Sequence, residues 1–220
     1  MAQPARFTFP AGTTTSICSA QTTAGAGSFV IDGPLVDTAS ITAGGPRRVI
    51  LPGIQRVVSL TSAANISAVN FTITGFDSRG VAVSETRAGP NINTVETAQE
   101  FAIVTSVTVN AAVGTGTSVG TGTTGTTRWW TNNLNIAPAN LALYVAITGT
   151  INYTVQDTPD NANDVTITPV AFPHPTLAAL TANGNSNYAY PPRYVRLKIN
   201  SSTIGATADF TINPAGIAGN

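Results

Sequence analysis

The sequence contains very few of the side chains that carry out chemistry. Its 220 residues include one cysteine, one histidine and one lysine, and charged residues make up 9% of the chain, whereas soluble domains average about 25%. A single cysteine excludes an intrachain disulfide and a site built from several thiolates. No run of apolar residues approaches the ~20 that a membrane-spanning helix needs. We therefore expect no membrane segment and no thiolate metal centre.

Positive charge is scarce and scattered along the chain. Arg47 and Arg48 are the only adjacent arginines, and the formal net charge is zero. Binding to nucleic acid requires clustered positive charge that neutralises phosphates, so we expect no nucleic acid partner. The N-terminal residues MAQPARFTFP show no apolar core of a secretory signal. The chain is therefore expected to be made and folded in a cytoplasm.

No catalytic group stands out. His174, between Pro173 and Pro175, is the only histidine that could act as a base, and its prolines are equally typical of a rigid connecting loop. Cys18 lies beside serines, without a neighbouring cation to stabilise a thiolate. The ten carboxylates show no spacing that marks a glycosidase pair. We expect no catalytic residue, no cofactor and no enzyme activity.

The segment 157–164 is the best candidate for a metal site. Its oxygen ligands would come from Asp157, Asp160, Asn161, Asn163 and Asp164, and such ligands suit Ca²⁺. The segment lacks the glycine and the terminal glutamate of an EF-hand loop. A turn in which short side chains bond their own backbone explains the same residues. This second interpretation is favoured, so no bound metal is expected.

Apolar and polar residues alternate with a period of two in many segments, including 69–75, 101–109, 151–155, 194–200 and 209–213. In 101–109 the expected buried side contains Phe101, Ile103, Val107 and Val109. Such alternation predicts antiparallel strands with one buried face. Turn residues at 77–80 and 148–150 predict hairpins between flanking strands. The expected fold is all-β, built from two antiparallel β-sandwich units of jelly-roll or immunoglobulin-like type, with almost no helix.

Residues 113–127 consist mostly of glycine and threonine. This composition predicts a flexible linker or an extended surface loop. We therefore expect an N-terminal β domain, residues 1–127, that ends in this linker or loop, and a C-terminal β domain, residues 128–220. A weak internal repeat supports two related units. Segments 56–61 and 70–75 are similar to 193–198 and 209–213, each pair being an Arg-led strand followed by a strand centred on Phe-Thr-Ile.

Aromatic residues and arginines are the candidates for contact with a partner, because these residue types dominate interface hot spots. The interface candidates are Arg128, Trp129, Trp130, Tyr188 and Tyr190. The two tryptophans directly follow the Gly/Thr segment, where they could either anchor a partner or pack in the core. Together with Tyr144, the same aromatic residues could instead form a platform that binds carbohydrate.

Several strand sequences share a recognisable pattern. A strand ends in Thr-Ser at 61–62, Phe-Thr-Ile-Thr-Gly follows at 71–75, an Asp-x-x-Gly turn lies at 77–80, and Ser-Glu-Thr at 84–86 leads to Gly-Pro-Asn at 89–91. Segments 101–119, 175–177, 187–191 and 193–200 fit the same pattern. Over roughly residues 47–212, the sequence resembles small β-rich virion structural proteins of tailed bacteriophages.

The resemblance implies a particle component without catalytic function. Its expected role is that of a capsid cement or decoration protein that stabilises the shell by protein–protein contacts, and a tail or head–tail junction protein is the alternative. Expected partners are other copies of the chain, as a homo-oligomer, and phage capsid or tail proteins. Its place would be the virion, after synthesis in the bacterial host cytoplasm. A carbohydrate-binding receptor-recognition module is the second alternative.

Overall fold

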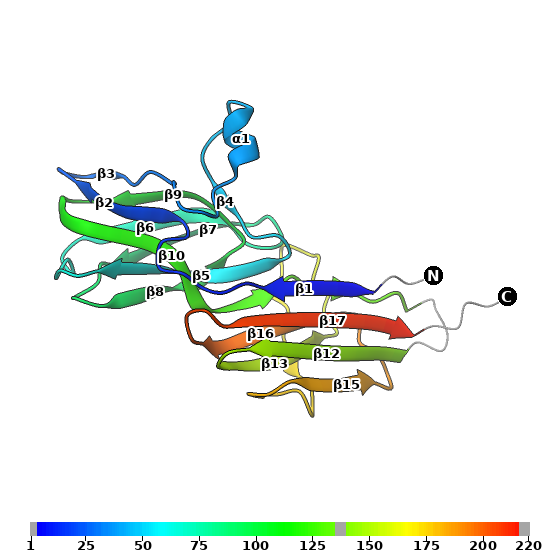
Figure 1. Cartoon of the computed structure of the whole chain (residues 1–220). Coiled ribbons are helices and arrows are strands. Elements are labelled where there is room, and N and C mark those ends of the chain that lie inside the picture. The colour runs from blue at the N-terminus through cyan, green and yellow to red at the C-terminus, as the bar shows by residue number, and fades with distance from the viewer. Residues whose placement is uncertain (1–3, 135–139, 216–220) are drawn as a thin grey trace. The chain divides into compact units, whose positions relative to one another are not determined.

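The computed structural model describes residues 4–134 and 140–215. These residues form antiparallel strands and one five-residue helix, α1 (Thr38–Thr42), which Asp37 caps by accepting a hydrogen bond from the Ser40 backbone N–H. The helix buries none of its residues and projects from the strands beside it (Figure 1). The prediction of an all-β, sandwich-like fold is confirmed.

The chain divides into two compact units. The N-terminal unit comprises Gly12–Gly125, and the C-terminal unit comprises Thr126–Asn220 together with Met1–Ala11. The predicted boundary at 127/128 lies two residues after the observed one, and the prediction also differs in the first eleven residues. They belong to the C-terminal unit because β1 (Ala5–Phe9) pairs with β17 (Thr207–Ala215) and buries Phe9.

The N-terminal unit contains two antiparallel sheets. One has the strand order β3-β9-β6-β7 with β4 paired to β9, and the other has the order β10-β5-β8 with β2 paired to β10. The strands are β2 (Cys18–Thr23), β3 (Gly27–Ser28), β4 (Val49–Ile50), β5 (Ile54–Ser62), β6 (Asn70–Phe76), β7 (Ala82–Ala88), β8 (Thr94–Phe101), β9 (Ile103–Val109) and β10 (Val113–Thr127). The core includes Leu60, Phe71 and Phe101, which are fully buried.

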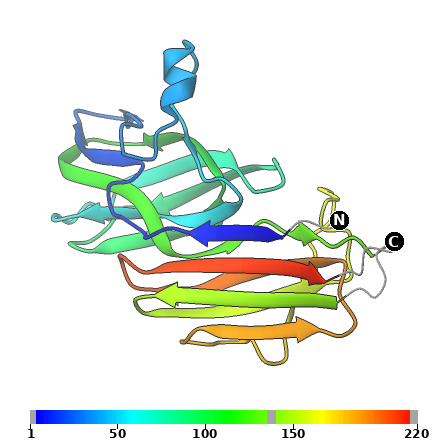
Figure 2. The ribbon, with the colours of Figure 1, turned by 45° about the vertical axis from the view of Figure 1, so that its right-hand side comes forward.

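The C-terminal unit also contains two sets of paired strands. One sheet has the order β1-β17-β12-β15 (Figure 2), and the other joins β14, β13 and β16, with β11 paired to β16. The remaining strands are β11 (Trp130–Thr131), β12 (Asn140–Thr148), β13 (Ile151–Thr158), β14 (Phe172–Pro173), β15 (Gly184–Tyr188) and β16 (Tyr194–Ser202). Leu143, Tyr153, Leu197 and Phe210 are buried in its core.

The period-two pattern identifies most buried faces correctly. Phe71 and Ile73 of β6, like Leu197 and Ile199 of β16, are buried. The prediction for 101–109 is wrong at one position. Val104 is buried and Ile103 is only half-buried, because a bulge between the Thr74–Ser106 and Gly75–Val104 pairs shifts the register of β9. Gly75 permits this bulge, since any Cβ there would overlap the Ile103 carbonyl.

The two predicted hairpin turns differ in outcome. Residues 77–80 do connect the paired strands β6 and β7, and Gly80 takes a positive φ of 82°. Asp77 stabilises this turn by accepting hydrogen bonds from the backbone of Arg79 and Val81. Residues 148–150 also form a tight connection, with Gly149 at a φ of 82°. This connection is not a hairpin, because β12 and β13 belong to different sheets.

The Gly/Thr-rich segment is neither a linker nor a loop. It forms β10, and most of its residues after Gly116 are buried. The chain ahead of β2 lies against it: Ile17 donates to the Val119 carbonyl, and Thr121 donates to the Thr13 carbonyl. Glycine is required where these backbones approach, because a Cβ at Gly120 would overlap Thr13 and Thr14. The small side chains of β10 thus allow the backbone at Thr13 and Thr14 to pack closely against it.

The proposed internal repeat has a structural parallel in strand placement. In each unit the Arg-led strand, β5 or β16, lies in one sheet, and the Phe-Thr-Ile strand, β6 or β17, lies in the other. The leading arginines differ, since Arg56 is buried and Arg193 is exposed above the ring of Tyr194. Duplication of a common unit stays a prediction.

Candidate functional site

His174 is a structural residue of the C-terminal unit. Its side chain is buried and packs edge-to-face against Tyr188, with the ring centroids 4.6 Å apart. Nδ1 accepts a hydrogen bond from the Thr176 backbone N–H at 3.1 Å, which leaves Nε2 to donate to the Asn187 carbonyl at 3.2 Å. Both ring nitrogens are thus engaged by the chain, and His174 holds β15 in place.

Cys18 begins β2 and is completely buried. Burial raises the pKa of its thiol to about 12, and the negative charge of Asp32 adds to the increase. Asp32 itself accepts hydrogen bonds from the Ser19 backbone N–H and hydroxyl, at 2.7 and 2.6 Å. The thiol therefore lacks the electropositive setting of a reactive cysteine.

Cys18 should resist alkylation in the folded protein. At pH 8 we expect iodoacetamide to modify the native thiol at least about 100-fold more slowly than the thiol in urea, because little thiolate forms and access is blocked. The pKa of the Cys18 thiol is higher in the folded chain than in the unfolded chain. Its burial therefore adds to the free energy of unfolding below about pH 8.5, the unfolded pKa, and this contribution is lost as pH rises toward 12. Mass spectrometry measures the modification, and equal rates in the two states would contradict this prediction.

Asp157 lies at the end of β13 and the other candidate calcium ligands lie in the loop that follows, and four of the five residues accept hydrogen bonds described below. Asp160 accepts a hydrogen bond from the Val170 backbone N–H at 2.7 Å, and Asp164 accepts from the Thr166 N–H and hydroxyl at 2.9 and 2.7 Å. Asp157 accepts from the Tyr188 hydroxyl at 2.8 Å, and Asn161 accepts from Tyr194 at 2.7 Å.

These bonds match the interpretation of the segment as an Asx-rich turn. Asn163 donates its backbone N–H to the Asn161 side chain, as such turns do. In residues 4–134 and 140–215, no group of three or more His, Cys, Asp and Glu side chains is placed to hold a metal ion. The same residues contain no helix that is long and apolar enough to cross a bilayer.

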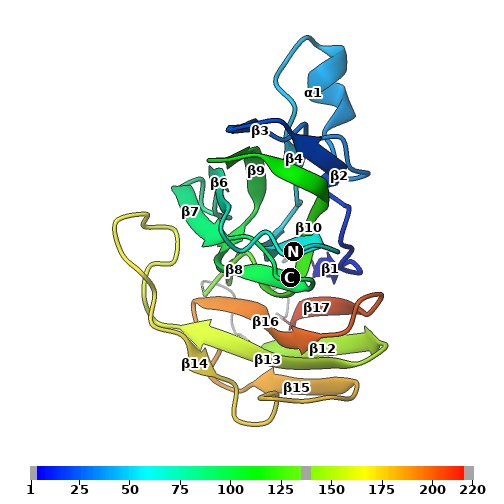
Figure 3. The ribbon, with the colours of Figure 1, turned by 90° about the vertical axis from the view of Figure 1, so that its left-hand side faces the viewer.

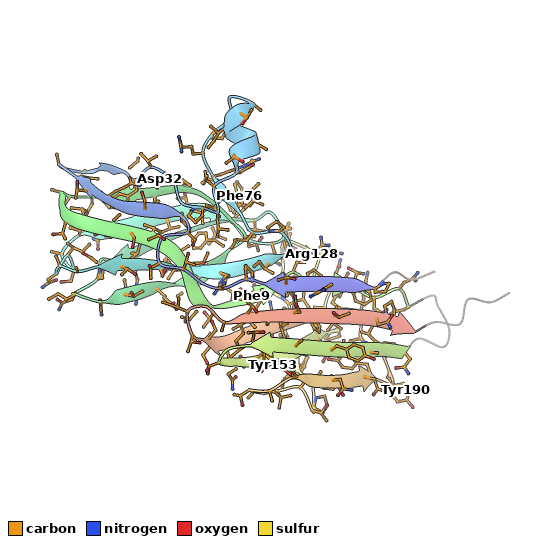
Figure 4. The ribbon with its side chains drawn as sticks, in the orientation of Figure 1. Phe9, Asp32, Phe76, Arg128, Tyr153 and Tyr190 are labelled. Atoms are coloured by element: carbon orange, nitrogen blue, oxygen red, sulfur yellow. The ribbon has the colours of Figure 1, made fainter. Side chains whose placement is uncertain are left out.

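Three interface candidates lie at the end of β10. The exposed Arg128 places its guanidinium 5.7 Å from the ring centre of Phe7, and Figure 4 shows it near β1. Trp129 is half-buried under the guanidinium of Arg196, at 4.3 Å. Trp130 lies in β11 opposite Val195. Arg128 and Trp129 therefore have ring contacts within their own unit, and the role of the three residues as partner anchors stays a prediction.

The two tyrosine candidates have opposite environments. Tyr188 is half-buried between His174 and Asp157, and this burial together with the Asp157 hydrogen bond raises the pKa of its hydroxyl. Tyr190 is 94% exposed and lies beyond the end of β15 (Figure 4). Tyr144 points outward from β12, in the sheet opposite β13 and β16. The aromatic residues therefore do not form one shared platform.

The structure reveals a feature that the sequence analysis missed, the β13–β14 loop (residues 159–171). Figure 3 shows this loop extending beyond the strands. The loop and the first residue of β14 expose four large apolar side chains: Val165 at 53%, Ile167 at 38%, Val170 at 59% and Phe172 at 50%. The signal is present in the sequence, since residues 165–172 contain no charged residue and Val170 directly follows Pro169.

The β13–β14 loop is ordered by its own contacts. The hydrogen bonds of Asp160, Asn161 and Asp164 described above tie it to itself and to β16, and Ala162 is 1% exposed. The polar side chains of the loop thus bond to its backbone and to β16, while its apolar side chains are exposed. A loop held by such bonds loses little conformational entropy when it binds, and its four exposed apolar side chains make it the candidate contact segment.

No protein family model matches the chain, and a search of curated proteins finds no related sequence. The candidate site therefore rests on geometry and chemistry alone: an ordered apolar loop in the C-terminal unit, with Asp157, Asp160 and Asp164 as the charged residues of the segment 157–172.

Proposed function

We propose that the chain is a non-enzymatic structural protein of a tailed-bacteriophage particle, specifically a capsid cement or decoration protein. The observation that carries this proposal is the ordered β13–β14 loop with its four exposed apolar side chains. Such a loop suits permanent contact with a neighbouring protein, because burial of apolar surface stabilises association. The sparse charge of the chain, 9% of residues, fits a surface that is largely covered by partners.

The resemblance of the strand sequences to phage virion proteins is the reason for proposing a phage particle, and the exposed apolar side chains of the β13–β14 loop are the reason for proposing a contact there. His174 and Cys18, the residues best suited to chemistry, are buried and engaged in packing, which supports a structural role. A tail or head–tail junction protein is the alternative with the same physical mechanism. Partner proteins would be neighbouring copies and capsid or tail subunits, joined in closed symmetry.

The loop should determine attachment to capsids. We expect purified protein to add back to capsids that lack it and to raise their heat resistance. The double variant Val170→Ser, Phe172→Ser should raise the protein concentration needed for half occupancy of the capsids about 100-fold, since two apolar contacts contribute about a tenfold change in affinity each. Quantitative gel analysis of sedimented capsids measures occupancy.

Ile204→Ser is the matched control, because Ile204 is 67% exposed in the same unit but lies in the turn before β17. It should add back like the natural chain. Recovery of the protein with isolated tails, and not with capsids, would favour the tail alternative. Undiminished occupancy of the double variant would show that the loop is not the contact.

A further inference from the structure

The outer face of the sheet β1-β17-β12-β15 carries a pocket of about 320 Å³. Its lining residues are Ala142, Tyr144, Asn185, Ser186 and Asn187, from the neighbouring strands β12 and β15. Tyr144 lies directly across from Asn185, and Ala142 across from Asn187. Alternation along β12 sends Leu141, Leu143 and Val145 into the core and leaves Ala142 and Tyr144 on the outer face.

The pocket combines an aromatic ring with unused hydrogen-bonding groups. Tyr144 is 47% exposed. Within the described part of the chain, no hydrogen bond engages the Tyr144 hydroxyl or the side-chain amides of Asn185 and Asn187. Each amide offers both donors and an acceptor, and each can therefore bond paired hydroxyl groups. The ring offers an apolar surface with a polar end.

The charge of this face indicates which ligand fits. In the row across the sheet, Asn185 and Tyr144 are followed by Thr211 and Arg6. Arg6 does not offer a free charge, because its guanidinium forms an ion pair with Asp209 at 2.6 Å. Asp209 also accepts from the Thr8 hydroxyl at 2.6 Å. The paired charges favour an uncharged ligand over an anionic or cationic one.

The edge strand β15, which carries both asparagines, is fixed by contacts with neighbouring segments. His174 donates to the Asn187 carbonyl, and the neighbouring Tyr188 packs on the His174 ring while its hydroxyl bonds to Asp157. The Ser186 hydroxyl bonds to Thr176 at 2.9 Å. These contacts fix the backbone of β15, so the two amides are presented at a constant spacing before any ligand arrives.

We propose that this pocket binds a neutral oligosaccharide. The ring of Tyr144 stacks on the apolar face of one sugar, and the amides of Asn185 and Asn187 bond its hydroxyl groups. A sugar has the alternating apolar faces and clustered hydroxyls that match an aromatic ring flanked by amides. This site is independent of the proposed particle role, because it lies on the outer face of a different sheet from β13 and β14.

Saturation-transfer NMR with maltohexaose, cellohexaose, mannotetraose and N-acetylglucosamine tetramer tests the proposal. At least one of these neutral sugars should bind. Tyr144→Ala should weaken that binding at least about tenfold, and Asn185→Ala by about fivefold, through loss of the stacked ring and of one amide. Tyr190→Ala is the matched control, since it removes an exposed tyrosine that does not line the pocket, and it should bind normally.

Binding of none of the four sugars would overturn the proposal. So would equal losses in Tyr144→Ala and Tyr190→Ala, or binding confined to a sialylated or sulfated sugar in the same assay. Circular dichroism verifies that each variant is folded. The result is separable from the particle role, because Tyr144→Ala should still add back to capsids like the natural chain.

Discussion

Gly120→Ala is expected to lower the free energy of unfolding of the N-terminal unit by about 3 kcal/mol or more. A Cβ at this position would overlap the backbone of Thr13 and Thr14, and overpacking of a buried strand costs about 1–3 kcal/mol and sometimes more. Gly120 does not take a positive φ, so the expected loss comes from crowding and not from backbone strain. Urea unfolding measured by far-UV circular dichroism gives the change, because the N-terminal unit contains no tryptophan or tyrosine that would report by fluorescence.

Gly114→Ala in the same strand is the matched control. A Cβ at Gly114 meets nothing within 4 Å, and the residue is exposed. The change should alter stability by no more than about 1 kcal/mol, since alanine restricts the unfolded chain slightly. Similar effects of the two substitutions would contradict the placement of 113–127 as a packed strand and would favour the flexible linker.

Arg56→Ala is expected to lower the free energy of unfolding by about 3–5 kcal/mol. Arg56 is 1% exposed in β5, and its guanidinium donates to the Gly122 carbonyl. Burial lowers the pKa of Arg56 to about 10, while the negative charge of Glu96 opposes that shift. The side chain therefore stays cationic at neutral pH. Removing it leaves the buried Gly122 carbonyl without its donor and the half-buried Glu96 carboxylate without a nearby cation, and the loss of a buried cation that has such partners is severe.

The environment of Arg56 explains why a smaller cation should not replace it fully. Glu96 is anchored by the Thr123 backbone N–H and hydroxyl at 2.7 and 3.1 Å, and a Cβ at Gly12 would come within 2.8 Å of the guanidinium. The site is thus shaped for a planar group. Arg56→Lys keeps the charge but loses the planar arrangement of donors, so we expect an intermediate loss of stability.

Arg87→Ala controls for the removal of positive charge. Arg87 is exposed on β7, and its loss should change stability by about 0.5 kcal/mol at most. Thermal or urea unfolding of the three variants at pH 7 provides the comparison. A loss below about 1 kcal/mol for Arg56→Ala would mean that the interior relaxes or admits water around Glu96.

The local sequence pattern was sufficient to predict most strands and one hairpin turn. Alternation in segments such as 69–75 and 194–200 follows from the pleat of a single strand. It can therefore be recognised from adjacent residues alone. Asp77 and Gly80 identify the β6–β7 hairpin because side-chain and φ requirements of a turn are also local. The same signals at 148–150 located a turn but not its partners, since a tight connection can join paired strands or cross between sheets.

The candidate sites were less predictable because their roles depend on distant residues. Trp129 is covered by Arg196, and Tyr188 is tied to Asp157, so neither is the free aromatic group that its sequence suggested. Tyr144 becomes part of a candidate site only in the folded chain, because strand pairing places Asn185 of β15 beside it. The oxygens of the candidate calcium ligands are occupied by hydrogen bonds from Val170, Thr166 and other groups that no spacing rule includes.

The sequence by itself determined the all-β class, because residue alternation and turn chemistry act over a few residues. Only the tertiary structure decided that 113–127 is a buried strand, since the use of its glycines depends on the chain at Thr13 and Thr14. It also decided that β1 belongs to the C-terminal unit, through pairing with β17 some 200 residues later. Burial and strand pairing are properties of contacts between distant segments, and composition does not encode which segments meet.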